Sequence, residues 1–256
     1  MRNTHKPMGK MIYVLTRFYI PGPMFYHAKK INSKTNIVND PQFGQMPYSD
    51  WLYHEERIKQ RLKIFNAVTR VSMELQTYKN FAWILFTGKG MPKKYIDEIA
   101  SIPRCEIIPV DTREDIVKKR FILNSEFITV RLDDDDALHA TYLEKIQHFN
   151  TPKCIVAPMQ GRYFTLMDEH TVQVGLPRSN DNDAVSCLYS AGCGVSNRNI
   201  YKLGDHCTYA EQGYDRQLIP GENMFLQSAG AHTWSDRTID ASANLQTFNI
   251  RDVLTQ

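Results

Sequence analysis

Four consecutive aspartates, Asp133 to Asp136, follow directly on residues 127–132, whose composition predicts a buried strand. Like charges about 5 Å apart repel by about 3 kcal/mol at an effective dielectric constant of about 20, so the cluster needs water, cationic side chains or a divalent cation nearby. Open α/β sheets bind ligands beyond the carboxyl ends of their strands, where carboxylates offer hard oxygen ligands. We therefore expect Mg²⁺ or Mn²⁺ at this strand end, with a solvated acidic turn as the alternative.

The composition indicates a soluble globular protein with a sizeable core, because 42% of its 256 residues are hydrophobic and 23% are charged. The net charge of +3 gives no argument for a nucleic-acid partner. The five cysteines form no CxxC pair, which predicts neither a zinc site nor a disulfide framework and favours a reducing cytoplasm. The polar N-terminus and the lack of a long apolar window predict no signal peptide and no membrane span, and they leave peripheral membrane contact open.

The first half of the chain alternates between strand and helix patterns. This alternation predicts a mostly parallel sheet covered on both faces. The expected strands are residues 11–15, 81–86, 106–110 and 127–132, and the expected helices are residues 53–76, 92–100 and 113–123. Residues 21–50 carry Pro, Gly, Asn and Ser repeatedly and read as a long loop.

The second half is less regular and predicts a smaller, mixed antiparallel part. Residues 140–149 read as a helix and residues 154–158 as a strand. Two runs, residues 162–166 and 171–176, suggest an antiparallel hairpin. Residues 223–228 read as a helix that precedes His232.

An α/β enzyme that uses a nucleotide-sugar donor needs a metal for the diphosphate, a nucleotide cleft and a group that deprotonates the acceptor hydroxyl. If the aspartates continue the extended strand, Asp133 and Asp135 project on one side and Asp134 and Asp136 on the other. One of these pairs would face the nucleotide. His232 is a further ligand candidate, although a single histidine is more often structural.

Three separated blocks of the sequence resemble the rhamnosyltransferase family, glycosyltransferases of the GT-A fold found in bacteria and viruses. The matching residues are 15–18, then 61–65 running on to Ser72, Gln76, Asn80, Phe81 and Trp83, and finally 131–138 with the DxD-type acidic motif. The resemblance implies a GT-A-like α/β fold. It also implies a tail at 1–10, a nucleotide-sugar-binding half at 11–139 and an acceptor-binding half at 140–256 of one domain.

The resemblance assigns roles to individual residues. Asp133 would contact the ribose or the metal, Asp135 would ligate the metal, and His232 would complete the coordination. Thr16 and Arg17 would line the base pocket, and Arg131 would pair with the aspartates. The implied nucleotide-binding set is Thr16, Arg17, Arg131, Asp133 and Asp134, and the implied metal set is Asp133, Asp135 and His232. Asp134 departs from the usual family pattern by adding one charge.

The catalytic base is the least determined residue, since an acceptor-side carboxylate works through its position near the attacking hydroxyl. Asp136, Asp183 and Asp215 are the candidates we select, and Asp181, Glu211 and His206 are alternatives. Inverting transferases commonly use such a base, and we expect inversion. The basic helix pattern at residues 57–70 reads as a solvated face, with a surface for anionic lipid as the alternative.

The sequence therefore predicts a metal-dependent hexosyltransferase, with rhamnose as the sugar that the resemblance indicates. Its donor would be a UDP-, GDP- or dTDP-sugar, and its acceptor a glycan or a lipid-linked glycan. One alternative is a sugar nucleotidyltransferase, which would release pyrophosphate from a nucleoside triphosphate; no Gly-rich basic loop follows Leu15. The other is a non-catalytic, calcium-dependent carbohydrate-binding protein, although the aspartate spacing does not match a twelve-residue calcium loop.

Overall fold

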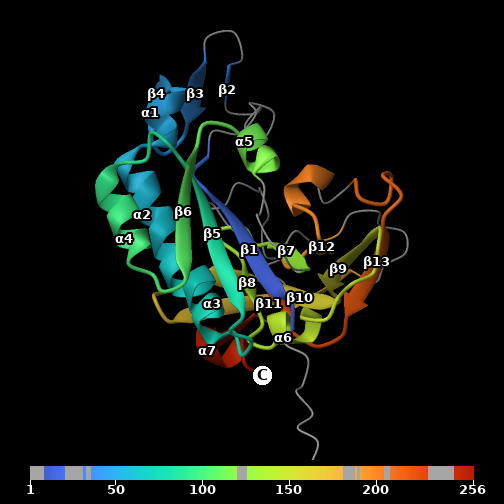
Figure 1. Ribbon diagram of the computed structural model, residues 1–256. Helices are drawn as coiled ribbons and strands as arrows, with labels where there is room; N and C mark the ends of the chain where they lie inside the picture. Colours follow the sequence, from blue (N-terminus) through green and yellow to red (C-terminus); the bar gives the residue numbers. More distant parts are fainter. Residues whose placement is uncertain are drawn as a thin grey trace, which may run out of the picture.

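The central element of the protein is a seven-stranded sheet, with strand order β13-β9-β12-β7-β1-β5-β6 (Figure 1). The computed structural model describes residues 9–20, 31–32, 36–119, 126–180, 188, 191–204, 208–229 and 245–256. The predicted tail therefore lies outside the described residues up to residue 8. The strands of this sheet are β1 (Met11–Phe18), β5 (Phe81–Gly88), β6 (Cys105–Val110), β7 (Phe127–Arg131), β9 (Cys154–Pro158), β12 (Gly194–Ser196) and β13 (Asp215–Ile219).

The sheet is mostly parallel. Strand β1 pairs in parallel with β5 and β7, β5 with β6, and β9 with β13. The short strand β12 runs antiparallel between β7 and β9. The predicted fold class, a GT-A-like α/β arrangement with a mostly parallel central sheet, is confirmed.

The inner strands β1, β5, β7 and β9 are mostly buried on both faces, which explains why they read as apolar runs, whereas the edge strands β6 and β13 are partly exposed. Ile12 and Val14 of β1 face a core that includes side chains from the helices α2 (Glu55–Ile64) and α4 (Lys93–Ala100), whereas Leu15 faces a second core with side chains from α5 (Arg113–Lys118). Further helices are α6 (Tyr142–Ile146), α7 (Ile250–Val253) and the 3₁₀ helix η3 (Ile200–Leu203). No helix in the described ranges is long and apolar enough to cross a membrane.

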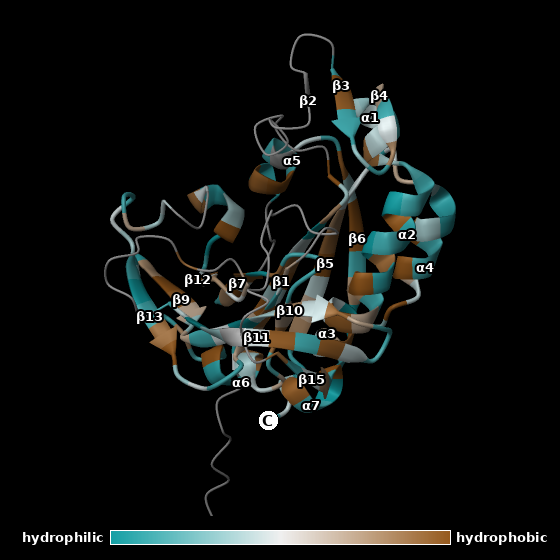
Figure 2. Cartoon of the chain, turned by 180° about the vertical axis from the view of Figure 1, so that it is seen from behind, coloured by the Kyte–Doolittle hydropathy of each residue, from teal (hydrophilic) through white to brown (hydrophobic). Residues whose placement is uncertain are grey.

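A long helix precedes β5 in the chain, as predicted for residues 53–76, but its middle third is a π-helix. It consists of α2 (Glu55–Ile64), η2 (Phe65–Arg70) and α3 (Val71–Leu75), which run on without a break. One side of this helix packs against the central sheet and another side against a second sheet. In Figure 2 the part of α2 that faces the viewer is largely hydrophilic. The apolar periodicity located the helix correctly but did not indicate its π segment.

The second sheet has five strands in the order β15-β11-β10-β14-β8. They are β8 (Ala137–Leu138), β10 (Gln160–Leu166), β11 (Thr171–Ser179), β14 (Phe225–Ser228) and β15 (Gln246–Asn249). The predicted hairpin is confirmed, because β10 and β11 pair antiparallel. The predicted helix at 223–228 is wrong: β14 is a fully buried strand between β10 and β8, and its two apolar residues followed by two polar ones do not alternate in the way that marks a strand.

A third, small sheet occupies part of the predicted loop at 21–50. It is formed by β2 (Ile31–Asn32), β3 (Ile37–Asp40) and β4 (Gly44–Pro47), and α1 (Tyr48–Leu52) follows it. Val38 and Trp51 form its apolar core, and the Trp51 indole donates a 2.8 Å hydrogen bond to Asp40. The loop prediction is therefore wrong for residues 31–32 and 36–50, and residues 21–30 and 33–35 lie outside the described residues. These short strands lack the alternation that marks longer ones.

We predict that replacing Gly161 with Ala destabilises the second sheet. A Cβ atom at this position would lie 2.4 Å from the carbonyl oxygen of Phe225, on the neighbouring strand β14. Because backbone must shift to relieve this contact, the free energy of unfolding should fall by about 1–3 kcal/mol, as for other overpacked sites. Urea denaturation checks the value, and wild-type stability of the variant would contradict the β10–β14 packing described here.

Candidate functional site

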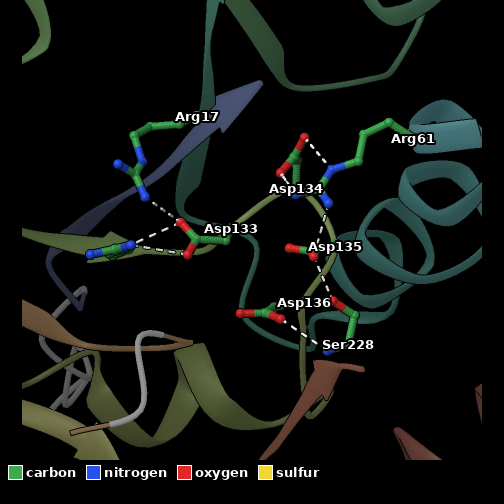
Figure 3. Close-up of polar contacts among 8 residues, drawn as sticks. Arg17, Arg61, Asp133, Asp134, Asp135, Asp136 and Ser228 are labelled. Atoms are coloured by element: carbon green, nitrogen blue, oxygen red, sulfur yellow. Dashed lines mark hydrogen bonds and ion pairs between the residues drawn. The ribbon is translucent and has the colours of Figure 1, made fainter. Parts of the chain in front are cut away.

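The four aspartates form a turn, the Asp133–Asp136 turn, at the carboxyl end of β7. The Leu132 amide still pairs with the carbonyl of Leu15 in β1, but the Asp136 amide bonds back to the Asp133 carbonyl at 3.1 Å. The expected extended alternation, with Asp133 and Asp135 on one side, is therefore wrong. The turn instead directs the four carboxylates to different partners (Figure 3).

Asp133 lies between two arginines. It accepts hydrogen bonds from Nε and Nη2 of Arg131 at 3.2 and 3.0 Å and from Nη2 of Arg17 at 3.4 Å. Both guanidinium groups also lie over the ring of Tyr201, at 5.4 Å for Arg17 and 5.7 Å for Arg131. The side chains of Arg17 and Asp133 are 27% and 21% exposed, so a ligand can reach this pair.

Asp134 and Asp135 share one buried arginine from α2. Arg61 donates from Nε and Nη2 to the two oxygens of Asp134, at 2.9 and 2.5 Å, and from Nη1 to Oδ2 of Asp135 at 3.0 Å. Burial alone would lower the pKa of Arg61, but the two carboxylates outweigh it and hold that pKa above its usual value. Burial raises the pKa of Asp134, although the charge and hydrogen bonds of Arg61 lower that pKa.

Strand β14 holds the far end of the turn through Ser228. The Ser228 hydroxyl donates to Oδ2 of Asp135 at 2.5 Å, and its backbone amide donates to Oδ1 of Asp136 at 3.2 Å. Oδ1 of Asp135 accepts no hydrogen bond from any described residue, and it points away from Arg61 and Ser228 (Figure 3). Neither Arg61 nor Ser228 was selected from the sequence. A charge inside the apolar stripe of Ile58, Leu62 and Phe65 was the available signal for Arg61.

Other predicted site residues lie elsewhere. Thr16 is fully buried and accepts a 2.9 Å hydrogen bond from the Trp83 indole, so it does not line an open base pocket. Asp215 begins β13 opposite Cys154, at the end of the sheet away from the Asp133–Asp136 turn. Glu211 is exposed on the preceding turn. Four candidates lie outside the described residues, namely His232, Asp183, Asp181 and His206.

The basic pattern at 57–70 is only partly a solvated face. Arg57 and Arg61 both turn inward, and the Arg57 guanidinium lies 3.3 Å from the centroid of the Trp51 ring. Arg57 is also hydrogen-bonded to Tyr19, whose pKa is raised to about 12 by burial even though Arg57 and Arg61 lower it. Tyr19 follows β1 with φ of 52°, a region that non-glycine residues rarely occupy. The inward arginines weaken the reading of this helix as a lipid surface.

The fit of a divalent cation follows from these contacts. Within the described ranges no three His, Cys, Asp or Glu side chains come together as a ready-made metal cage. Mg²⁺, however, is usually held by one or two carboxylates together with water and substrate phosphates. Asp135, whose Oδ1 accepts no hydrogen bond from any described residue, and the partly exposed Asp133 are the two carboxylates that could hold such a cation.

Comparison with known families identifies one match over most of the chain. Residues 12–240 match the family model described as "Putative rhamnosyl transferase". No curated protein matches the sequence.

Solved structures give weaker likenesses. The crystal structure of S. aureus TarS 1–349 aligns with a TM-score of 0.42 and 8% identity, covering 86% of this chain and 60% of TarS. The complex of TarS 1–349 with UDP-GlcNAc aligns with a TM-score of 0.43 and 7% identity, covering 87% of this chain and 60% of TarS. The inositol-1-phosphate CTP transferase from T. maritima aligns with a TM-score of 0.33 and 11% identity, covering 86% of this chain and 89% of the transferase. The chain thus spans about 60% of the TarS structures.

We predict that replacing Arg61 with Met strongly destabilises the fold. The change leaves the carboxylates of Asp134 and Asp135 buried without their cation, which should lower the free energy of unfolding by about 3–5 kcal/mol. Arg70 provides the matched control, because it pairs with Glu74 on the exposed side of the same helix. Its replacement by Met should change stability by at most about 0.5 kcal/mol. Equal losses in urea denaturation of the two variants would contradict the role of the buried pairs.

Proposed function

We propose, from the premise that the chain belongs to the rhamnosyl transferase family, that this glycosyltransferase moves a hexosyl unit from a nucleotide-diphosphate donor bound beside Asp133. The observation that carries the proposal is the pair of guanidinium groups, Arg17 and Arg131, around one partly exposed carboxylate. Two positive charges against one negative charge leave an excess that suits a diphosphate, and Arg binds phosphate oxygens in a fork geometry.

The position in the sheet supports the same assignment. Arg17 and Asp133 lie at the carboxyl ends of β1 and β7, two neighbouring parallel strands in the middle of the sheet. Ligands of open α/β sheets bind at such an edge. The donor base, UDP, GDP or dTDP, and the sugar, with rhamnose first, are part of the proposal, as is a glycan or lipid-linked acceptor. A lipid-linked acceptor would bring the protein to a membrane surface.

We include a divalent cation, Mn²⁺ or Mg²⁺, in the proposal. Asp133 and Asp135 would hold it, with His232 as the further ligand expected from the sequence. When bound, the cation supplies charge neutralisation for the departing diphosphate. The residues of the chain do the rest: Arg17 and Arg131 bind and orient the donor, and Arg61 and Ser228 hold Asp135.

Asp136 is our candidate base because it belongs to the Asp133–Asp136 turn beside the proposed donor site. Its carboxylate is buried and is oriented by the Ser228 amide. We propose that Asp136 deprotonates the acceptor hydroxyl, in an inverting displacement. Asp215 is too far along the sheet to share this role, since it is level with residues near the start of β7.

We predict that exchanging Asp135 for Asn lowers kcat/KM for the preferred nucleotide sugar by about 10²-fold or more, because the change removes the open anionic oxygen but keeps the side-chain shape. Release of nucleoside diphosphate from a panel of UDP-, GDP- and dTDP-sugars with Mn²⁺, and again with EDTA, measures the effect. Circular dichroism checks that the variant is folded. Full turnover by the folded variant would refute the metal assignment.

A second prediction compares Asp136, the proposed base, with Asp215, the other described aspartate that the sequence analysis selected. Replacing Asp136 with Asn should lower kcat by about 10²–10⁴-fold with little change in donor KM, whereas replacing Asp215 with Asn should leave kcat within about twofold. Steady-state kinetics with the donor found above gives both values. The opposite order of effects would transfer the role to Asp215 and contradict the placement of the acceptor beside Asp136.

A further inference from the structure

We propose that Arg61 is a positioning residue for transfer: it fixes Asp135 so that Oδ1 of this carboxylate faces the donor site. The proposal rests on the proposed function and assigns to it a residue that lies outside the donor contacts. Arg61 comes from α2, whereas Asp135 follows β7, and the two residues are 74 positions apart in the chain.

The first step is the geometry of the guanidinium. The planar guanidinium of Arg61 donates two hydrogen bonds to Asp134 and one to Asp135. Both oxygens of Asp134 are therefore occupied by Arg61. Asp134 serves as the anchor of the guanidinium and Asp135 as the group that it orients. A Lys ammonium is a point charge without this planar fork and cannot hold both carboxylates in the same way.

The second step is that Asp135 is fixed from two elements. Its Oδ2 accepts one hydrogen bond from Arg61 of α2 and another from the Ser228 hydroxyl of β14. With Oδ2 held from both sides, the carboxylate cannot rotate without losing hydrogen bonds, and Oδ1 stays in one direction (Figure 3). Hydrogen bonds that orient a ligand in this way are worth about 10–100-fold in metal affinity or activity.

The third step is that Arg61 itself cannot move away. It is 5% exposed, and its helix packs between the central sheet and the second sheet. Directly after the last turn of this helix, Gln76 accepts a hydrogen bond from the Leu143 amide at 3.2 Å and donates one to the His139 carbonyl at 3.0 Å. The helix therefore holds the segment after β7 at two places, at Asp134 and Asp135 and again beyond β8.

The experiment compares Arg61→Lys with Ser228→Ala, the double variant and the control Arg70→Lys. Three measurements are made on each folded variant: kcat and donor KM, the dissociation constant of Mn²⁺ alone by electron paramagnetic resonance, and the thermal midpoint of unfolding. We expect Arg61→Lys to lower kcat and to weaken Mn²⁺ binding by about 10–100-fold each, and Ser228→Ala to give smaller losses. Because both residues act through Oδ2 of Asp135, the double variant should lose less than the product of the single effects. Arg70→Lys should match the wild type.

The outcomes separate the two proposals. If the wild-type protein binds Mn²⁺ but transfers no sugar, the proposed function is overturned, and the Mn²⁺ affinity of Arg61→Lys then shows whether Arg61 positions Asp135. If the wild-type protein transfers sugar without binding Mn²⁺, the kcat of Arg61→Lys alone tests the positioning role. A purely structural Arg61 lowers the thermal midpoint alone, and wild-type kcat with wild-type Mn²⁺ affinity in Arg61→Lys overturns the positioning role. If Arg61→Lys does not fold, unchanged kcat and Mn²⁺ affinity in Ser228→Ala overturn it.

Discussion

The buried ion pairs of Arg61 with Asp134 and Asp135 are the constraint on which the rest of the site depends. A buried charge is tolerated only when it is paired and hydrogen-bonded, so the long helix and the turn after β7 must be placed together. The packing of this helix between two sheets supplies the rigidity that such a pairing needs. Arg61 accordingly links the core of the fold to the edge where the donor is proposed to bind.

Much of the central sheet could be predicted from the sequence, because β1, β5 and β7 are continuous apolar runs and strand alternates with helix. The strand β14 could not, since all four of its residues are buried and give no alternation. The pairing of Arg131 with an aspartate was expected from the sequence and is confirmed at Asp133, but the partners of Asp134, Asp135 and Asp136 could not be predicted. Arg61 and Asp135 meet only through the tertiary fold, and the extended chain assumed for the aspartates is in fact a turn that reverses their directions.

A second chain of contacts joins the small sheet to this network. Asp40 accepts from the Trp51 indole, the Arg57 guanidinium lies over that ring, and Arg57 is hydrogen-bonded to Tyr19 at the end of β1. Tyr19 has a positive φ, and such backbone strain persists only where the surroundings fix it. Arg57 and Arg61, one helical turn apart, therefore connect α1 and β3 with the Asp133–Asp136 turn.

The described ion pairs give the two ends of this turn opposite formal charge. Asp133 faces Arg17 and Arg131, which leaves one positive charge in excess, whereas Asp134 and Asp135 share Arg61, which leaves one negative charge in excess. A donor's diphosphate is anionic, and its anomeric carbon gains positive character as the bond to the leaving group breaks. A divalent cation held by Asp133 and Asp135 would neutralise the negative excess, so Arg17, Arg131 and the cation would together favour a diphosphate beside Asp133. The arginine positions therefore favour one place for the diphosphate, at the carboxyl ends of β1 and β7.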